Sequence, residues 1–536
     1  MDQRRFLLAL VLMFLLLFTY EQLFVRPYRR PPTTPPETEQ QPPAPTAEHP
    51  AAAPESPPVA GAAGLAAPVT DDTQTVTVDT DLVRATITTM GARLRSLQLK
   101  NFRQTVEANS PPLDLVTASQ VLPLTAELGN GTNDATVVYT PSKTAIEVHG
   151  GDLAEIVFTG KQADGRAIEK RYRFPGNSYL FDLDINASQE RNRLGLILTP
   201  ISELGASGGR SSGHEVAVVL ADGRVTEKPI DKVAQATEVQ APVWAGFSAQ
   251  YFATVAVPPE GNSTALLTTS DNLAVTRLQV PAPEGKAHFD LFFGPKEHEI
   301  LTAAGHQLDR VLDFGRFWFI ALPLLWGLRF LHRFIPNYGV NIIVLTALVK
   351  LATAPLTRTS FRSMKAMQKL QPEMQRLRER YKDDQGALQK EVMELYKRNH
   401  VNPLSGCVPM LLQIPIFFGL YTALSSAIEL RHAPFMLWIN DLAAPDRLQI
   451  PGVPIPGGGV PVLVIVMGLS MLLQQLMTPQ QGDPNQQRMM MIMPVVFTFI
   501  SINFPSGLVL YWLVNNLLTM GQQWTMLRSP DGGARR

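Results

Sequence analysis

The sequence predicts an α-helical membrane bundle of six transmembrane helices, five of them forming its core, joined to a large antiparallel β-sandwich. Three observations support this fold class. Apolar stretches close to the ~20 residues that a bilayer requires fill the C-terminal third. Apolar and polar residues alternate in many short segments between about 76 and 293. Charged residues make up only 18% of the chain, below the ~25% of soluble proteins, because the C-terminal third contains so few of them.

The chain begins with a predicted uncleaved membrane anchor, residues 1–25. Arg4 and Arg5 precede an apolar run that extends from about Phe6 to Phe24, and no small-residue cleavage site follows it. Residues 26–73 are rich in Pro, Ala, Thr and Glu and have almost no large apolar side chains. Such a segment cannot bury enough surface to offset its chain entropy, so we expect a disordered linker.

Residues 74–312 are predicted to form the β-sandwich. Segments such as YLFDLDIN and HFDLFFG alternate with period two, and Gly, Pro, Asn and Asp separate them. The histidines of this region, His149, His214 and His288, are scattered. We therefore assign them structural or surface roles.

The motif content of the whole chain argues against an enzyme. A single cysteine, Cys407, excludes an intrachain disulfide and a multi-cysteine metal site. The sequence has no Walker motif, nucleophile elbow or zinc motif. Its formal net charge is zero, so no overall field attracts nucleic acid. We expect no catalytic residue, no metal, no cofactor, no nucleic-acid partner and no small-molecule substrate.

Residues 313–337 are predicted to form an amphipathic helix in the membrane interface, because Pro323 and several Arg and His residues interrupt an otherwise apolar, aromatic-rich segment. Residues 338–527 are predicted to form the five-helix core. Its spans cover approximately residues 338–356, 407–428, 460–477, 489–503 and 506–524. Only Phe504 and Pro505 join the last two spans, which predicts a tight helical hairpin.

The loop charges predict the topology. Loop 358–406 has eleven Lys or Arg against six acidic residues, whereas loop 429–459 has two basic residues against three acidic ones. The positive-inside rule places the first loop in the cytoplasm and the second outside. Alternation of the spans then places both termini, including the tail 528–536, in the cytoplasm. The β-sandwich is predicted to lie in the periplasm of a bacterium whose inner membrane holds the spans.

Lys350 is the most informative polar residue of the predicted spans. A cation at the centre of a transmembrane helix costs about 2.5–3.5 kcal/mol and normally faces a bundle interior or a wet cavity. The five C-terminal spans contain no acidic residue to pair with it. Snorkelling toward the headgroups is the alternative. Other polar residues of the spans favour a hydrated pocket, although such residues often serve only as interhelical hydrogen-bond partners. They are Thr346, Gln413, Gln474, Gln475, Asn515 and Asn516.

Residues 358–404 are predicted to form a basic cytoplasmic helical hairpin. Apolar residues in its first half follow one helical face, at Met364, Met367, Leu370, Met374, Leu377 and Tyr381. Asp383 and Asp384 are expected to cap a second helix. Attraction to anionic lipid and docking of ribosomes or nascent chains are compatible roles. We assign the docking role to Arg376, Arg378 and Arg380.

Several segments of the C-terminal region resemble the YidC family of membrane protein insertases in its long Gram-negative form. They are FWFIALPLLWGLRFLHRF, LVKLATAPLTRTSFRSMKAMQKLQPEMQRLRERY, VNPLSGCVPMLLQIPIFFGLYTAL and MMMIMPVVFTFISINFPSGLVLYWLVNNLLT. The resemblance implies a protein that inserts and helps to fold integral membrane proteins, alone or with the Sec translocon. It also implies the partners: newly made and nascent membrane proteins, membrane lipid, the SecYEG channel, its SecDF accessory and the ribosome.

The resemblance also implies the functional residues. A hydrophilic groove open to the cytoplasm and to lipid is expected around Lys350, which occupies a position where most family members have arginine. Thr346 matches a second groove position, and Gln413 and Asn515 complete the expected groove. The path of substrate helices toward lipid is expected along Met410, Phe417, Tyr511 and Trp512.

Overall fold

The computed structural model describes residues 74–528 with internal gaps. The gaps are residues 108, 117–120, 129–131, 163, 188–192, 202–214, 234–235, 271–272, 382–383, 402–407, 451–457 and 478–483. For residues 385, 408–412, 484–489 and 526–528 it describes the backbone alone. The predicted anchor 1–25, the linker 26–73, the tail beyond residue 528, His214, Cys407 and the side chain of Met410 lie outside the described residues.

The described chain forms two compact units. The β unit holds the described residues up to Phe102 and Pro112–Gly294, and the helical unit holds Arg103–Pro111 and the described residues from Pro295 onward. The predicted end of the β domain at residue 312 stays a prediction. The last strand ends at Pro295, and the residues after it form short helical segments, which have no strand partner in a sheet.

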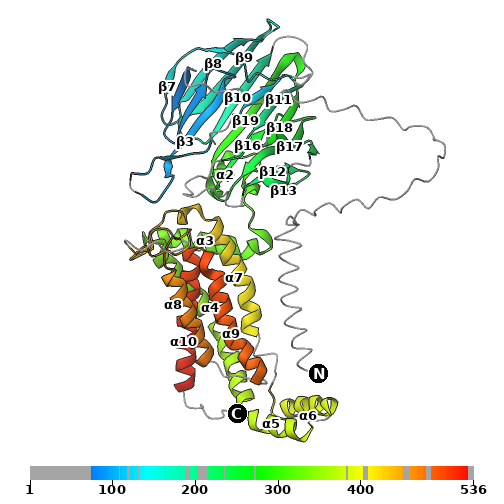
Figure 1. Ribbon diagram of the computed structural model, residues 1–536, viewed down its shortest axis with the longest axis vertical. Coiled ribbons are helices and arrows are strands. Elements are labelled where there is room, and N and C mark those ends of the chain that lie inside the picture. Colours follow the sequence, from blue (N-terminus) through cyan, green and yellow to red (C-terminus); the bar gives the residue numbers. More distant parts are fainter. Residues whose placement is uncertain are drawn as a thin grey trace, which may run out of the picture. The chain divides into compact units, whose positions relative to one another are not determined.

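The described strands of the β unit form three sheets (Figure 1). The first has the order β4-β3-β2-β1-β7, with β1 Thr75–Asp79, β2 Val83–Thr88, β3 Arg93–Arg103, β4 Pro112–Asp114 and β7 Ala145–Glu147. The second has the order β13-β12-β15-β16-β19-β10-β9-β8-β6, with β6 Tyr139–Pro141, β8 Leu153–Lys161, β9 Ala167–Pro175, β10 Leu180–Ala187, β12 Val216–Ala221, β13 Arg224–Pro229, β15 Trp244–Ser248, β16 Phe252–Val257 and β19 Lys286–Pro295. The third has the order β14-β17-β18-β11-β5, with β5 Thr125–Glu127, β11 Arg193–Leu198, β14 Thr237–Gln240, β17 Thr264–Ser270 and β18 Leu273–Pro281.

The period-two sequence pattern explains which side chains form the core of the β unit. In β9, the side chains of Ile168, Tyr172 and Phe174 are buried, while the alternate residues remain partly exposed. Tyr172, Phe174 and Phe181 stack in sequence, with ring centroids 6.2 and 4.5 Å apart. The antiparallel, β-rich domain predicted from the alternation is confirmed, and the short parallel pair β1–β7 is the one departure among the described pairings.

One residue breaks this inward apolar pattern, because Lys170 of β9 is fully buried. Its Nζ pairs with Asp134 Oδ2 at 2.6 Å and donates to the carbonyl oxygens of Gly91 and Leu124 at 2.8 Å each. All three ammonium hydrogens therefore have an acceptor. Asp134 Oδ1 accepts from the backbone N–H of Ala126 at 2.8 Å. The ion pair joins segments from all three sheets.

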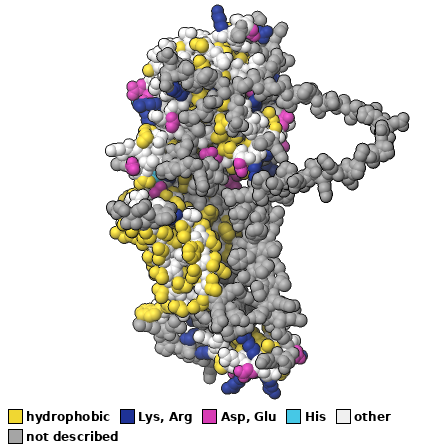
Figure 2. Space-filling view, viewed as in Figure 1, with side chains coloured by type: hydrophobic (Ala, Val, Ile, Leu, Met, Phe, Trp, Pro, Cys, Tyr) yellow, Lys and Arg dark blue, Asp and Glu magenta, His cyan; other side chains and the backbone are white. Residues whose placement is uncertain are grey.

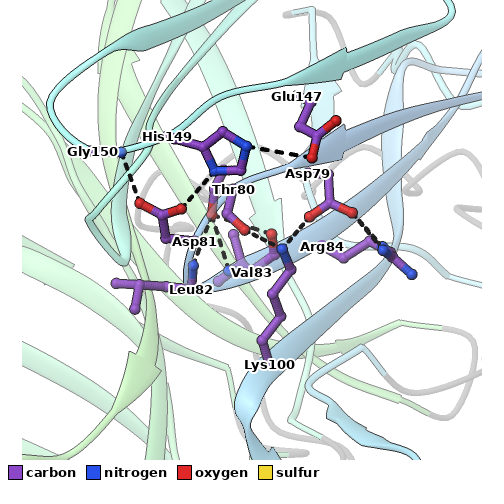
Figure 3. A network of polar contacts seen from close by, with 10 residues as sticks. All are labelled: Asp79, Thr80, Asp81, Leu82, Val83, Arg84, Lys100, Glu147, His149 and Gly150. Carbon is purple, nitrogen blue, oxygen red and sulfur yellow. Dashed lines mark hydrogen bonds and ion pairs between the residues drawn. The ribbon is translucent and has the colours of Figure 1, made fainter.

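A second polar network ties the β1–β2 turn to the segment that follows β7 (Figure 3). Asp81 accepts from the backbone N–H of Gly150 at 2.7 Å and contacts His149 Nδ1 at 2.7 Å. Glu147 lies 3.3 Å from the other ring nitrogen. The hydrogen bond with Asp81 raises the pKa of His149, and the Gly150 N–H and His149 lower the pKa of Asp81.

This network predicts a measurable titration. Because the pKa of His149 is raised, its contribution to stability is present when the imidazole is protonated, and it is lost as pH rises through the raised pKa. We expect histidine-selective NMR to give His149 a midpoint above the model-peptide value of about 6.5. Asp81→Asn should bring the midpoint down, whereas Glu147→Gln should lower it less because that contact is longer. An unchanged midpoint in Asp81→Asn contradicts this assignment.

The helical unit contains the remaining elements (Figure 1). They are α2 His298–Ala304, α3 Trp318–His332, α4 Tyr338–Lys369, α5 Gln371–Arg380, α6 Gln385–Arg398, α7 Val408–Ser426, α8 Val462–Met477, α9 Pro484–Ile500 and α10 Ser506–Arg528. Helix α10 packs against α4 and α8, α3 packs against α7, and α9 packs against α8. Hydrophobic side chains cover much of the visible face of this unit, whereas Lys and Arg side chains gather at the α5–α6 hairpin (Figure 2).

Helix α3 presents two different faces. Ala321, Leu325 and Leu328 are buried in the core of the helical unit, whereas Trp318 and Trp326 are more than half exposed. Gly419 of α7 allows a close approach, because a Cβ atom there would lie 2.7 Å from Ile320 Cγ2. The segment predicted as an amphipathic helix over 313–337 is thus helical at residues 318–332.

Within the described residues, α4 alone is long and apolar enough to cross a membrane by length and composition. The apolar helices Val462–Met477 and Met490–Asn503 are shorter. The count of six transmembrane helices therefore stays a prediction.

The cytoplasmic segment differs in one respect from its predicted form. The apolar residues from Met364 to Tyr381 predict one helical face, but the structure ends α4 at Lys369 and starts α5 at Gln371. Pro372 lies in the first turn of α5, where a proline is well accommodated because the N–H it lacks would have no partner within the helix. The predicted cap of the second helix is confirmed for Asp384, whose Oδ1 accepts from the N–H of Ala387 at 3.0 Å.

Candidate functional site

The start of α4 is firmly held, and this positions Lys350. Asn337 caps the helix, with its Oδ1 accepting from the N–H of Val340 at 3.1 Å and its Nδ2 donating to the carbonyl oxygen of Phe435 at 2.9 Å. The Phe435 ring packs against Gly339, where a Cβ atom would lie 2.0 Å from a ring carbon. A larger residue at 339 would therefore displace the helix.

Lys350 lies partly buried on α4 and faces α10. Its Nζ donates to Oδ1 of Asn515 at 3.0 Å. In the part of the chain that the structure describes, no carboxylate lies within ion-pair distance of this ammonium group. The partner is thus a neutral amide, which orients the cation without cancelling its charge. The flanking Leu348 and Leu351 are exposed, as expected for the lipid-facing side of a spanning helix.

Thr346, one turn before Lys350, lies in a drier environment than the prediction of a groove residue implies. Its side chain is buried and its hydroxyl donates to the carbonyl oxygen of Ile342 at 2.6 Å. Thr346 and Tyr511 line a cavity of about 10 Å³ together with aliphatic residues. Such a volume is close to the minimum for one water molecule, so this cavity cannot admit a peptide.

A second polar pair connects α7 with α10. Gln413 Nε2 donates to the hydroxyl oxygen of Tyr511 at 2.7 Å. A third pair connects α10 with α8, where Asn516 Nδ2 donates to Oγ of Ser470 at 3.0 Å. The polar residues of the bundle thus join neighbouring helices in pairs. Such interhelical hydrogen bonds are one of the two roles expected of these residues, and the hydrated pocket stays a prediction.

The aromatic residues predicted along the substrate path come together. Phe417 of α7 and Trp512 of α10 have ring centroids 4.4 Å apart, and Phe497 of α9 lies 4.1 Å from Trp512. Tyr511 is buried beside them, whereas Phe417 and Trp512 are partly buried at the margin of the core. The backbone of Met410, the fourth residue predicted along this path, belongs to α7.

The three predicted docking arginines are all exposed on α5. Arg376 and Arg380 line a groove of about 230 Å³ that Arg398 of α6 also borders. Arg378 does not line that groove. It lies close enough to Tyr396 for its charge to counter the rise that burial causes in the pKa of that tyrosine.

One ion pair of the helical unit was missed by sequence reasoning. Arg329 Nε of α3 lies 2.6 Å from Glu429 Oε1, which belongs to the short 3-10 turn Ile428–Leu430 that follows α7. The sequence signal was a glutamate directly after an apolar span, together with an arginine in an aromatic-rich helix. This pair and the Gly419 contact fix α3 to α7.

The comparisons with known proteins agree over both units. Residues 330–532 match the family described as 60Kd inner membrane protein, and residues 75–327 match the family described as YidC periplasmic domain. A protein of Geobacter metallireducens described as membrane protein insertase YidC is 38% identical over 541 residues, which cover 97% of each chain. The protein of the same description from Syntrophus aciditrophicus is 39% identical and covers 98% of this chain and 99% of its own. A solved structure described as an active YidC insertase is 18% identical, covers 86% of this chain and 94% of its own, and has a TM-score of 0.39.

Proposed function

Since this chain belongs to the YidC family of membrane protein insertases, we propose that its substrates cross the membrane beside the Lys350–Asn515 pair. The protein is an inner-membrane insertase with a periplasmic β-rich domain, and its substrates are membrane proteins that enter lipid. One observation carries the proposed mechanism: the Lys350 ammonium is held by a neutral amide, so its charge remains available to a passing substrate.

The first step of the proposed mechanism is electrostatic. A substrate presents a short acidic or polar terminal segment, and its carboxylates are attracted to the uncompensated Lys350 cation. Two charges 4 Å apart attract by about 4 kcal/mol at an effective dielectric constant of 20, so one contact lowers the cost of entering the bilayer. Gln413 of α7 and Asn515 of α10 offer further hydrogen-bonding groups to the substrate, whereas the buried hydroxyl of Thr346 bonds within α4.

The second step is hydrophobic. While the polar segment is held near Lys350, the apolar helix of the substrate passes Met410, Phe417, Tyr511 and Trp512 and enters lipid. Each buried apolar square ångström gains about 25 cal/mol, so a transmembrane helix supplies the free energy for the step. We propose that this chain therefore hydrolyses no nucleotide and has no catalytic residue, metal or cofactor in the insertion step.

The proposed topology follows from the loop charges. Six spanning helices, including the anchor, place both termini and the α5–α6 hairpin in the cytoplasm, with α3 lying in the periplasmic interface. The 32 residues of α4 extend for about 48 Å at 1.5 Å per residue, longer than a ~30 Å hydrocarbon core. Its last turns thus reach the cytoplasm, where Arg376, Arg378 and Arg380 offer a basic surface to a ribosome or a nascent chain. The Sec translocon, with SecYEG and SecDF, is a further proposed partner.

Trp512 provides the test of the substrate path. Replacing it with alanine removes the ring that contacts both Phe417 and Phe497. We expect about tenfold slower insertion of a purified single-span substrate into vesicles that contain this chain, a loss of ~1.4 kcal/mol. The loss should be the same for substrates with charged and uncharged tails, because this contact acts on the apolar helix.

Phe499→Ala is the matched control. Phe499 is 69% exposed on the neighbouring α9, so the same loss of an aromatic ring should leave insertion unchanged. Trp512→Phe should restore most of the rate if the aromatic surface is what counts. Full activity of Trp512→Ala, or an equal loss in Phe499→Ala, contradicts the proposed path.

A further inference from the structure

A cluster of metal-ligating side chains lies on the outer face of the nine-stranded sheet, at its adjacent strands β10 and β19. The antiparallel register places Asp182 directly opposite Asp290, and Asp184 directly opposite His288. All four residues occupy the outward positions of their strands, between buried neighbours such as Leu183 and Phe289. The pleat therefore brings four polar side chains to one face of two paired strands.

The imidazole of His288 lies between carboxylates. Its Nδ1 is 2.7 Å from Asp184 Oδ1, and its Nε2 is 3.0 Å from Asp290 Oδ1. One potential ligand atom from each of Asp182, His288 and Asp290 lies within 4.8 Å of the others. All three side chains are partly exposed, so an ion can reach them from solvent.

The charges of the cluster favour a cation. Like charges directly opposite each other on paired strands destabilise a sheet, and Asp182 faces Asp290 in this way. Arg173 of β9 pairs with Asp184 at 2.7 Å and with Glu155 at 3.2 Å. Its guanidinium group therefore lies on the Asp184 side of the cluster. A divalent ion between Asp182 and Asp290 removes the repulsion.

We propose that Asp182, His288 and Asp290 bind one divalent transition-metal ion, of which Zn²⁺ is the best match. One imidazole nitrogen with two carboxylate oxygens is a donor set that zinc accepts in proteins, with water completing its coordination. Asp184 is the positioning residue: it accepts the Nδ1–H of His288 and so directs the lone pair of Nε2 toward the ion, the usual arrangement around metal-bound histidine. Binding displaces the proton from Nε2.

This proposal departs from the expectation that the chain has no metal site. The signal was in the sequence, where D-L-D and H-F-D place two ligand-type residues on one face of each strand. What the sequence did not reveal was that these two strands are neighbours. The ion would join two central strands of the sheet, so we infer a role in stabilising the periplasmic domain.

His149 supplies the internal comparison (Figure 3). It also contacts two carboxylates, but its two ring nitrogens face Asp81 and Glu147 separately, and no third ligand atom converges on either nitrogen among the described residues. A variant at His149 therefore removes a similar His–carboxylate contact without touching the proposed site.

The test is calorimetric titration of the full-length chain, without a polyhistidine tag and in detergent, with Zn²⁺, Mn²⁺, Mg²⁺ and Ca²⁺ in turn. We expect one Zn²⁺ per chain with micromolar or tighter affinity, and weaker binding of Mg²⁺ and Ca²⁺. Asp182→Asn and His288→Gln should each weaken Zn²⁺ binding more than tenfold, and Asp184→Asn about tenfold. His149→Gln should bind like the parent chain.

Thermal unfolding gives a second readout and shows whether each variant folds. Zn²⁺ should raise the unfolding temperature of the parent chain and of His149→Gln, and it should leave Asp182→Asn and His288→Gln unchanged. The proposal is overturned if the parent chain shows no saturable Zn²⁺ binding. It is equally overturned if folded Asp182→Asn and His288→Gln bind Zn²⁺ with the affinity of the parent.

Discussion

Replacing Lys350 with glutamine is expected to slow the insertion of substrates with acidic tails at least about tenfold. The change keeps a polar side chain that can still contact Asn515, but it removes the charge that attracts a carboxylate. Tenfold corresponds to ~1.4 kcal/mol, well within the roughly 4 kcal/mol of one close charge pair near a protein surface. The measurement is the initial rate of insertion into vesicles for two single-span substrates that differ only in tail charge.

Lys350→Arg is the matched control, since it keeps the charge and adds the planar geometry that pairs well with carboxylates. We expect it to insert acidic-tail substrates at least as fast as the parent. The uncharged-tail substrate should respond little to either change. If Lys350→Gln inserts both substrates at the parental rate, the charge of residue 350 has no part in the mechanism.

Replacing Lys170 with methionine is expected to remove about 3–5 kcal/mol from the free energy of unfolding of the β unit. The side chain is fully buried and makes an ion pair with Asp134 and two hydrogen bonds to backbone carbonyl oxygens. Methionine fills a similar volume but leaves the Asp134 carboxylate buried without its cation. Urea titration of the full chain, with the folded fraction read by pulse proteolysis, measures the loss.

Two further variants isolate the cause. Arg166→Met breaks an exposed ion pair with Asp164 and should cost less than about 1 kcal/mol. Adding Asp134→Asn to Lys170→Met should recover part of the stability, because the amide removes the buried charge and keeps an acceptor for Ala126. Equal losses in Lys170→Met and Arg166→Met would show that the buried ion pair contributes no more than a surface pair.

The sequence predicted the β domain well because its signal is local. Alternation within one strand, as in β9 or β10, determines which side chains point inward. It does not reveal which strands are neighbours. The Lys170–Asp134 pair and the Asp182–His288–Asp290 cluster both depend on pairings between residues far apart in the chain, so neither could be derived from spacing.

In the helical unit, too, the sequence shows local patterns but not which distant residues become neighbours. The sequence draws attention to Lys350 because an isolated cation in an apolar helix is costly wherever it lies. The partners of the polar residues are on other helices: Asn515 for Lys350, and Tyr511 for Gln413. The apolar stripe does not predict the break before α5, although Pro372 is visible in the sequence.

The continuity of α4 has a mechanical consequence. One helix carries both Lys350 and the residues that lead into the α5–α6 hairpin, and about 28 Å separate Lys350 from Lys369 along its axis. Pro355 lies inside this stretch, and an interior proline removes one backbone hydrogen bond of the helix, so α4 can bend there. Under the proposed mechanism, a load that a docked particle places on the hairpin therefore reaches Lys350 only as far as α4 resists bending at Pro355 and at the turn at Leu370.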